Sequence, residues 1–372
     1  MSLRKNIEHT SSYERNRSSR RQRLKKKTTR KIFPKVFVIV LNFNGVKYLK
    51  SCLPSLISQT YSNYQVIVCD NASTDGSADY VKLNFPSAIL IQNRENLGFP
   101  KGNNEALKLA LDKGADYLQL FNNDTIAEKD VIESLVRTAE SNEKIGIVGP
   151  KILDFENRNL IQEMGMTCDK FGFPAAMETP RESVFEAFYV SGCAMLIKQE
   201  VLRKIGGFDE KYFMFSEDLD LCWRTQLAGY TVVVNKAAKV YHVSGGSITG
   251  GVVKNGTYTT TLKRIYLRER NTLRTLIKNY SIANLIKIIP VYLVMLSLEC
   301  FIWACLLKPS VSVSLLKGSW WNIKALRDTL SQRQKTQMFR KIADKQIIRK
   351  IIKGYAKLQV FRLVGIPRVL ES

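Results

Sequence analysis

Residues 36–44 read VFVIVLNFN, and this stretch decides the fold. The apolar run 36–41 is rich in β-branched residues, which predicts a strand buried on both faces, as in a parallel sheet. Short apolar runs return at 66–69, 88–92, 117–121 and 145–148, separated by segments with helical spacing of apolar residues. Strands that alternate with helices of this length predict an α/β fold, with a doubly wound sheet and helices on both faces.

Polar residues follow each of the first four predicted strands. They read NFN at 42–44, DNASTDGS at 70–77, RENLGF at 94–99 with GNN at 102–104, and NNDT at 122–125. Turns and helix caps use the same residue types, so a single cluster of this kind can be explained as a turn or a cap. Four together favour a ligand site, because ligands of these sheets bind beyond the carboxyl ends of the strands.

The Gly-rich signatures of dinucleotide-binding and P-loop proteins are absent, which disfavours dehydrogenases and P-loop enzymes. The remaining way to hold a nucleotide diphosphate is a divalent metal with oxygen ligands.

The chain from about 36 to 250 resembles family 2 glycosyltransferases with the GT-A fold, in particular the rhamnosyltransferase-like and galactofuranosyltransferase-like members. The resemblance rests on the four clusters above and on an ordered set of later motifs: SGCAML at 191–196, GGFDE at 206–210, EDLDLCWR at 217–224 and HVSGGS at 242–247. It implies a GT-A mixed sheet and inverting transfer of rhamnose or a similar hexose. The donor would be a UDP- or dTDP-sugar, and the acceptor a saccharide or lipid-linked saccharide in cell-surface polysaccharide assembly.

The resemblance also implies roles for single residues. Asp70 would bind the base of the nucleotide, and Asn44 and Asp75 would frame the nucleoside. Further nucleotide-sugar contacts are expected along the ribose and diphosphate and at the ends of the first and fourth strands, from Asn42, Asn96, Gly98, Asn103, Asn123 and Asp124.

A divalent metal, Mn²⁺ or Mg²⁺, is implied as cofactor. Asp124 matches the last carboxylate of the family's Asp-X-Asp motif, whereas Asn122 stands at the first position and is a weaker ligand. His242 would complete the metal shell, and imidazole suits Mn²⁺ better than Mg²⁺. The simpler explanation of His242 alone is a capping residue in a glycine-rich turn.

Asp218 is the predicted catalytic base. Inversion requires a carboxylate that accepts the proton of the attacking hydroxyl, and neighbouring like charges raise a carboxyl pKa toward a useful value. Glu217 and Asp220 are possible substitutes, and Trp223 and Arg224 are assigned with them to the acceptor side. Asp218 could also serve as an N-cap.

The net charge of +24 belongs to the two ends of the chain. Residues 1–33 contribute +10 and residues 308–372 contribute +12. The first segment is poor in apolar residues and is predicted to be a disordered basic arm. No signal peptide is expected, and the seven cysteines predict buried thiols in a reducing compartment.

The expected organisation is therefore the arm 1–33, a catalytic domain 34–260 and a helical, membrane-associated region 261–372. In the last region, 288–307 is apolar and long enough to span a bilayer, but Pro290, Glu299 and basic flanks leave a re-entrant hairpin open. Residues 338–364 predict a basic amphipathic helix on anionic lipid. The predicted location is the cytoplasmic face of the cell membrane.

Three other functions are weighed. The first is an inactive, membrane-anchored module that binds a nucleotide sugar, and retention of Asp124, Asp218 and His242 argues against it. Nucleic-acid binding by the basic ends is not expected, because no recognisable module accompanies them. A nucleotidyltransferase would leave the segment 217–218 unexplained.

Overall fold

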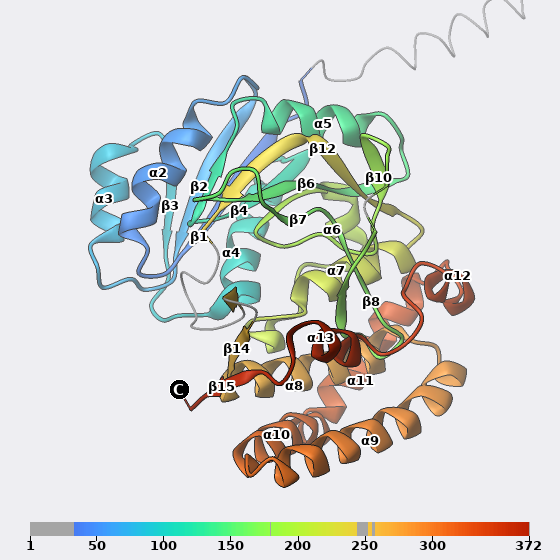
Figure 1. The fold of residues 1–372 in the computed structure, drawn as a ribbon. Coiled ribbons are helices and arrows are strands. Elements are labelled where there is room, and N and C mark those ends of the chain that lie inside the picture. Colours follow the sequence, from blue (N-terminus) through green and yellow to red (C-terminus); the bar gives the residue numbers. More distant parts are fainter. Residues whose placement is uncertain (1–32, 179, 244–251, 255–256, 372) are drawn as a thin grey trace, which may run out of the picture. The chain divides into compact units, whose positions relative to one another are not determined.

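The alternation of strands and helices builds a large mixed sheet (Figure 1). A computed structural model describes residues 33–178, 180–243, 252–254 and 257–371. Four parallel strands start the sheet, in the order β3-β2-β1-β4. Their bounds are β1 (Val36–Asn42), β2 (Tyr64–Asp70), β3 (Ile89–Gln92) and β4 (Tyr117–Asn122).

Beyond β4 the sheet becomes mixed. β11 (Ala194–Lys198) runs antiparallel to both β4 and β6 (Ile145–Asp154), and β12 (Thr231–His242) then pairs parallel with β6. β10 (Val184–Glu186) closes this edge, while β5 (Thr125–Ala127) and β7 (Ile161–Glu163) pair with β12 and β6. The predicted α/β fold with a mixed sheet is confirmed.

Alternate residues of β1 enter two different cores. Val38 and Val40 face a core with α2 (Val46–Ile57) and α5 (Val131–Glu140). Phe37 and Ile39 face the other core, which includes α4 (Gly98–Asp112), α6 (Gln199–Ile205) and α7 (Glu217–Leu227). Helices therefore cover both faces, as expected for a strand that is apolar at every position. A short helix, α3 (Ser77–Asn84), follows β2.

All seven cysteines are free thiols, and five of them are buried, in agreement with the prediction. Cys300 is only half-buried and Cys305 is exposed, so the expectation of burial is wrong for these two. Both lie on the apolar C-terminal helix described below.

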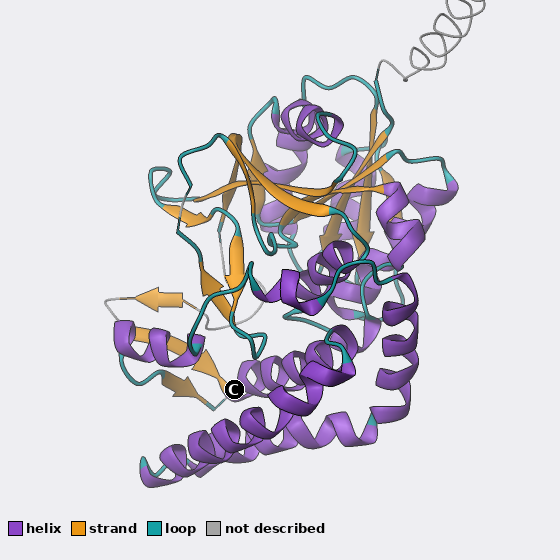
Figure 2. Cartoon of the chain, turned by 90° about the vertical axis from the view of Figure 1, so that its right-hand side faces the viewer, coloured by secondary structure: helices purple, strands orange, loops and turns teal. Residues whose placement is uncertain are grey.

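The C-terminal helices continue the second core. They are α8 (Leu262–Asn279), α9 (Ile282–Cys305), α10 (Pro309–Lys324) and α11 (Leu326–Phe339). In Figure 2 these long helices gather in the lower half and the main sheet in the upper half. Trp223 of α7 stacks edge-on against Tyr280 at the end of α8, with ring centroids 4.9 Å apart. Residues Lys35–Ser372 form one compact unit.

Helix α9 is the one described helix that is long and apolar enough to cross a membrane. The chain does not continue in its direction, because α10 turns back along it after Leu307. Ser312 Oγ of α10 donates a 2.8 Å hydrogen bond to the carbonyl oxygen of Cys300. Asn322 of α10 in turn binds the carbonyl oxygen of Arg270 on α8 at 2.9 Å. The apolar segment is thus the first arm of a helical hairpin.

The continuous amphipathic helix predicted over 338–364 is wrong. The segment forms two short helices, α12 (Asp344–Ile348) and α13 (Ala356–Val364). Between them Ile352 donates its N–H to the carbonyl oxygen of Cys168, and Ala356 donates its N–H to Asp169. These tertiary hydrogen bonds, and Gly354 at φ +103°, replace the helical pattern.

The remaining described elements are short: β8 (Met166–Cys168), β9 (Pro174–Ala176), the 3₁₀ turn η1 (Glu210–Tyr212), β13 (Val252–Lys254), β14 (Thr257–Thr261) and β15 (Arg368–Leu370). Strand β15 pairs with β14, which returns the end of the chain to the segment that precedes α8.

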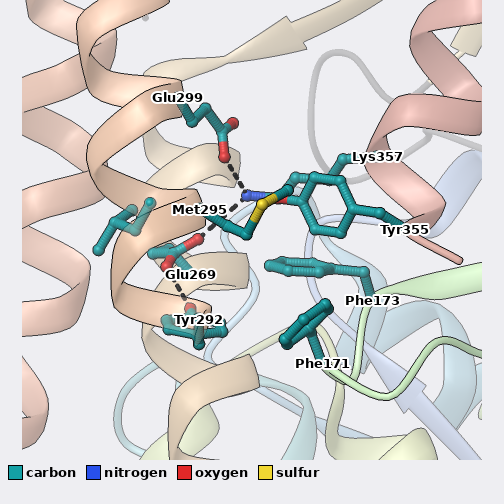
Figure 3. Close-up of a pocket in the computed structure, with 9 residues that line it drawn as sticks. Phe171, Phe173, Glu269, Tyr292, Met295, Glu299, Tyr355 and Lys357 are labelled. Carbon is teal, nitrogen blue, oxygen red and sulfur yellow. Dashed lines mark hydrogen bonds and ion pairs between the residues drawn. The ribbon is translucent and has the colours of Figure 1, made fainter. Parts of the chain in front are cut away.

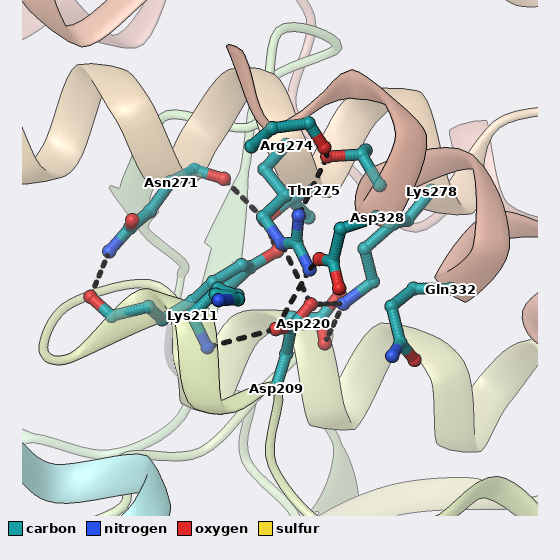
Figure 4. Close-up of polar contacts among 12 residues, drawn as sticks. Asp209, Lys211, Asp220, Asn271, Arg274, Thr275, Lys278, Asp328 and Gln332 are labelled. Atoms are coloured by element: carbon teal, nitrogen blue, oxygen red, sulfur yellow. Dashed lines mark hydrogen bonds and ion pairs between the residues drawn. The ribbon is translucent and has the colours of Figure 1, made fainter. Parts of the chain in front are cut away.

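A buried network of charges joins α7, α8 and the loop before η1 (Figure 4). Lys278 Nζ lies 2.6 Å from Asp209 and 3.0 Å from Asp220, and Arg274 binds Asp209 through two nitrogens. Asp220 also pairs with Arg224 at 2.8 Å. Burial alone would raise the pKa of Asp209, but Lys278 and Arg274 hold it well below its usual range.

Replacing Lys278 by alanine should lower the free energy of unfolding by about 3–5 kcal/mol, because two buried carboxylates lose a shared cation. The matched control is Arg137→Ala, which removes an exposed ion pair with Glu133 and should cost less than about 1 kcal/mol. Urea unfolding of both variants measures the difference. Equal losses would show that the buried network does not hold the helices together.

Candidate active site

The register of the parallel strands aligns the polar strand ends. Asn42 lies opposite Asp70, and Leu41 lies opposite Asn122. Asn42 Nδ2 donates to Asp70 Oδ1 at 2.8 Å, and Asn123 Nδ2 donates to Asn42 Oδ1 at 2.7 Å. Buried hydrogen bonds therefore join three residues that were predicted to bind the nucleotide sugar, Asn42, Asp70 and Asn123. They lie at the carboxyl ends of the parallel strands.

Asp70 also shapes the loop that follows it. Its Oδ2 accepts the backbone N–H of Ser73 at 2.9 Å, and its Oδ1 accepts the Ser73 hydroxyl at 2.6 Å. The side chain is buried, so one carboxylate fixes both the end of β2 and the turn beyond it.

Asn44 and Asp75 hold the same loop against the start of α2. Asn44 has φ +48°, and its Oδ1 accepts the N–H of Thr74 at 2.8 Å. Asp75 accepts the N–H of Val46 at 2.9 Å and also binds Ser77. Burial would raise the pKa of Asp75, but hydrogen bonds from Ser77 and Val46 lower it. Both side chains are thus engaged within the loop.

Asn96, Gly98 and Asn103 organise the entry into α4. Asn96 Oδ1 accepts the N–H of Gly98 at 2.9 Å, and Asn103 Nδ2 donates to the carbonyl oxygen of Phe99. Gly98 has φ +75°, and a Cβ there would lie 2.6 Å from Phe213. Asn71, which the sequence did not single out, donates to the carbonyl oxygen of Gly98 at 3.1 Å.

Asp124 and His242 come together across the sheet although 118 positions separate them in sequence. His242, at the end of β12, pairs with Thr125 of β5, and its Nε2 lies 3.4 Å from Asp124 Oδ1. Its Nδ1 contacts Gln162 Oε1 at 3.2 Å. An amide oxygen only accepts, so this contact favours a hydrogen on Nδ1.

The Asp124 and His242 pair fits a divalent cation. Adjacent ligands of an octahedral ion with bonds of about 2.1 Å stand about 3 Å apart, which is close to the separation of the Asp124 oxygen and the His242 nitrogen. No group of three or more His, Cys, Asp or Glu side chains that could hold a metal is found in the described residues. Any further ligands would come from the diphosphate and water, as is usual for Mg²⁺-type sites. Ser244 to Ser247 of the HVSGGS motif lie outside the described residues.

A group of carboxyls surrounds the turn 191–193. Asp218 Oδ2 accepts the N–H of Gly192 at 3.3 Å, and Glu163 Oε1 accepts the N–H of Ser191 at 2.9 Å. The carbonyl oxygen of Cys193 accepts the N–H of Asn122, which brings this turn beside the Asn122–Asp124 segment. Glu163 lies on a three-residue strand without any motif, so no local signal in the sequence could have identified it.

Burial and mutual repulsion raise the pKa of these carboxyls. Burial, followed by the charge of Asp218, raises the pKa of Glu163 to about 8. Burial also raises the pKa of Asp218 against hydrogen bonds from Leu219 and Gly192, and it raises the pKa of Glu217 strongly. Glu217 Oε2 has no hydrogen-bond partner among the described residues. The site therefore contains one carboxyl, Glu163, with a pKa of about 8, beside two further carboxyls whose pKa is raised.

Gly192 permits the close approach on which this turn depends. A Cβ at this position would lie 2.8 Å from the ring of Phe99 and 3.8 Å from Asp218 Cβ. The SGC motif thus combines two N–H donors for carboxyls with a contact to α4.

Asp220, Trp223 and Arg224 are placed differently from the prediction of an acceptor-side role. Asp220 is fully buried between Arg224 and Lys278, and Arg224 also donates to the carbonyl oxygens of Ile205 and Gly207. Trp223 is buried between the rings of Phe188 and Tyr280. These contacts give the three residues a structural role, because helix α7 turns them away from solvent.

A solved structure with a similar architecture indicates the fold type. The structure of GalNAc-T7 with UDP, GalNAc and Mn²⁺ superposes with a TM-score of 0.53 at 15% identity, over 66% of this chain and 48% of that one. The alignment spans about half of that protein, and at this identity it shows the fold alone, which is the GT-A type.

Part of the sequence matches one family. Residues 37–206 match the profile of Glycosyl transferase family 2. This segment, somewhat less than half of the chain, is similar to that family of glycosyltransferases.

Two curated relatives are similar over about half of the chain. The N-acetylglucosaminyl-diphospho-decaprenol L-rhamnosyltransferase of Mycobacterium tuberculosis is 27% identical over 55% of this chain and 75% of its own length. The rhamnosyltransferase WbbL of Escherichia coli K12 is 25% identical over 52% of this chain and 78% of its own.

The raised pKa of Glu163 predicts a pH-dependent stability. Between the unfolded pKa of about 4.3 and the folded pKa, the folded state keeps a proton that the unfolded state has released, so stability falls as pH rises. Glu163→Gln should make this fall shallower, whereas the exposed control Glu143→Gln should not. Urea unfolding between pH 5 and 8 measures the slopes. A Glu163→Gln slope equal to that of the wild type would contradict the burial of a titrating carboxyl.

Proposed function

We propose that this protein is an inverting glycosyltransferase that transfers rhamnose or a similar hexose from a UDP- or dTDP-sugar. The acceptor is a saccharide carried on a lipid at the cytoplasmic face of the cell membrane, in the assembly of cell-surface polysaccharide. The observation that carries the proposal is Asp218, whose carboxyl is held by two backbone N–H groups beside the turn that borders the Asn122–Asp124 segment.

The strand ends bind the donor nucleotide. Asp70 supports recognition of the base, since a carboxylate accepts the ring N–H of a uracil or thymine. Asn42 and Ser73 already bind this carboxylate, which fixes its orientation before the nucleotide arrives. The loop built by Asn44, Asp75 and Asn96 lines the path from the base toward Asp124.

Asp124 and His242 would hold the metal, Mn²⁺ or Mg²⁺, which when bound would supply positive charge for the leaving diphosphate. Gln162 orients His242 through Nδ1, and such outer contacts fix the ring position of a ligating histidine. The softer imidazole ligand favours Mn²⁺ over Mg²⁺.

Asp218 accepts the proton of the attacking acceptor hydroxyl. Hydrogen bonds from Gly192 and Leu219 hold its carboxyl in place, and burial raises its pKa against these hydrogen bonds. A base whose pKa lies nearer to neutrality transfers protons more effectively than an ordinary aspartate.

The sugar and the acceptor are inferred from the relatives. Both curated relatives named above are rhamnosyltransferases, and the mycobacterial one acts on a decaprenol-linked saccharide. The α9–α10 hairpin supports a lipid-linked acceptor, because exposed apolar side chains such as Phe301, Leu307 and Trp320 lie on it. A hairpin keeps both basic flanks on one side of the membrane, as the positive-inside rule requires.

Asp218→Asn should lower kcat by about 10²- to 10⁴-fold and leave the Kd of the donor nearly unchanged, because the base contacts the acceptor hydroxyl. The control is Asp79→Asn, which changes an exposed carboxyl on α3 and should keep full activity. A screen of UDP- and dTDP-sugars identifies the donor for this assay. If the wild type binds the donor but does not transfer the sugar, an inactive binding module is supported instead. If Asp218→Asn keeps more than a tenth of wild-type turnover, Asp218 is not the base.

Asp124→Ala and His242→Ala should each weaken Mn²⁺-dependent nucleotide binding by at least about tenfold. Asn122→Asp should strengthen it by restoring a carboxylate, and Asp130→Ala, at an exposed position, should have no effect. Calorimetric titration of UDP with and without Mn²⁺ measures these changes. Full wild-type activity in excess chelator would remove the metal from the mechanism.

A further inference from the structure

A second cavity lies outside the catalytic site, between α9 and the segment 345–355. Its volume is about 870 Å³. Four of its lining residues are cationic: Lys170, Lys345, Arg349 and Lys353. The other side chains are mostly apolar or aromatic, and no carboxylate lines the cavity. A cavity with this charge favours an anionic ligand that also has an apolar part.

Three of the four cations of the cavity have no carboxylate partner among the described residues. Within the part of the chain that the structure describes, no ion pair is found for Lys345, Arg349 or Lys353. The nearest carboxyl along the chain, Asp344, is already bound by Arg340 at 2.7 Å and by Asn284. The three cations therefore present uncompensated positive charge at an open cavity.

The neighbouring Lys357 shows the contrast (Figure 3). It lies 2.7 Å from Glu299 and 3.3 Å from Glu269, and its Nζ lies 4.1 Å from the ring centre of Phe173. This pairing explains a carboxyl inside the apolar helix α9 and fixes α13 against it. Phe171, Met295 and Tyr355 line both the surroundings of Lys357 and the cavity.

One stripe of α9 leads away from the cavity. Asn284 and Met295 line the cavity, and Val291, Leu298 and Ile302 follow on the same helical face at spacings of three, four and seven residues. These three apolar side chains are 44%, 52% and 55% exposed. Beyond them the exposed Leu306 and Leu307 form the tip of the hairpin. An apolar track thus begins at a cationic cavity and ends at an apolar tip.

We propose that this cavity binds the phosphate headgroup of an anionic membrane phospholipid, whose acyl chains lie along the exposed apolar stripe of α9. Lys345, Arg349 and Lys353 bind the phosphate, and the hairpin then lies at the membrane interface instead of crossing it. The site refines the proposed membrane location and does not depend on glycosyl transfer, since none of its residues belongs to the catalytic site.

The main test compares two triple variants of the full chain with equal changes of charge. One is Lys345→Gln/Arg349→Gln/Lys353→Gln, and the control is Lys50→Gln/Lys108→Gln/Lys113→Gln, which changes exposed lysines of the catalytic part. Sedimentation with vesicles of 70% phosphatidylcholine and 30% phosphatidylglycerol measures partitioning. The cavity variant should bind about 10- to 100-fold more weakly than wild type, and the control less than about threefold more weakly. Equal losses would show diffuse surface attraction and overturn the site.

A second measurement separates a lipid from a free anion. Monomeric dihexanoyl phosphatidylglycerol should raise the Tm of the wild type and not that of the cavity variant, while inorganic phosphate at the same concentration should raise neither. An equal rise with inorganic phosphate would overturn the lipid assignment. Leu298→Ser/Ile302→Ser should weaken vesicle binding more than the exposed control Leu83→Ser/Leu160→Ser, and the reverse order would overturn the role of the stripe.

Hydrolysis of the donor is the fold control, and the cavity variant should keep it. If this variant retained vesicle binding but lost transfer to a lipid-linked acceptor alone, the cavity would hold the acceptor and the phospholipid assignment would be wrong. Failure of catalysis in the wild type would refute the proposed function and leave the vesicle comparison unaffected.

Discussion

The buried cations Arg274 and Lys278 hold this structure together, because both reach from α8 into the catalytic domain. They neutralise Asp209, which ends the GGFD sequence, and Lys278 also neutralises Asp220 in α7. Helix α8, which is far from the other two segments in sequence, therefore shares one charge network with them. Removing water from these charges is costly, and only complete pairing offsets that cost. Helix α8 is for this reason part of the catalytic scaffold.

The position of the proposed base follows from this network. Asp220 anchors the first turn of α7 in the core, and Asp218 lies two positions earlier, where the helix begins and its carboxyl reaches Gly192. The anchored residue has a lowered pKa because the charges of Lys278 and Arg224 outweigh its burial, whereas Asp218 has a raised pKa because its burial outweighs its hydrogen bonds and the charge of Arg268. One short helix thus contains two aspartates with opposite electrostatic environments, one structural and one suited to accept a proton.

The C-terminal helices have one side packed in the core and another side exposed. One side of α8 and α9 enters the core with Leu276, Ile288 and Tyr292, while the other side of α9 remains exposed and apolar. Lys357 compensates the carboxyls of Glu269 and Glu299 inside, and Lys345, Arg349 and Lys353 of the cavity have no such partners among the described residues. Under the proposed function, the exposed apolar side of α9 would face the membrane, and the polar strand ends would bind the nucleotide.

Local patterns in the sequence determined the strands β1 to β4 and β6, the helices between them, and the polar strand ends where Asn42, Asp70 and Asn123 meet. Periodicity and strand-end chemistry depend on neighbouring residues, so a single sequence contains them. The roles predicted for Asp124, His242 and Asp218 came with the resemblance to family 2 glycosyltransferases. Local patterns failed for the segment 338–364, where hydrogen bonds to Cys168 and Asp169 break the expected helix. Only the tertiary structure decided that Asp220 is buried, that Glu163 joins Asp218, and that cations collect beside α9. These depend on contacts between distant residues, such as the Asp209–Lys278 pair, and no local pattern encodes which distant partners will meet.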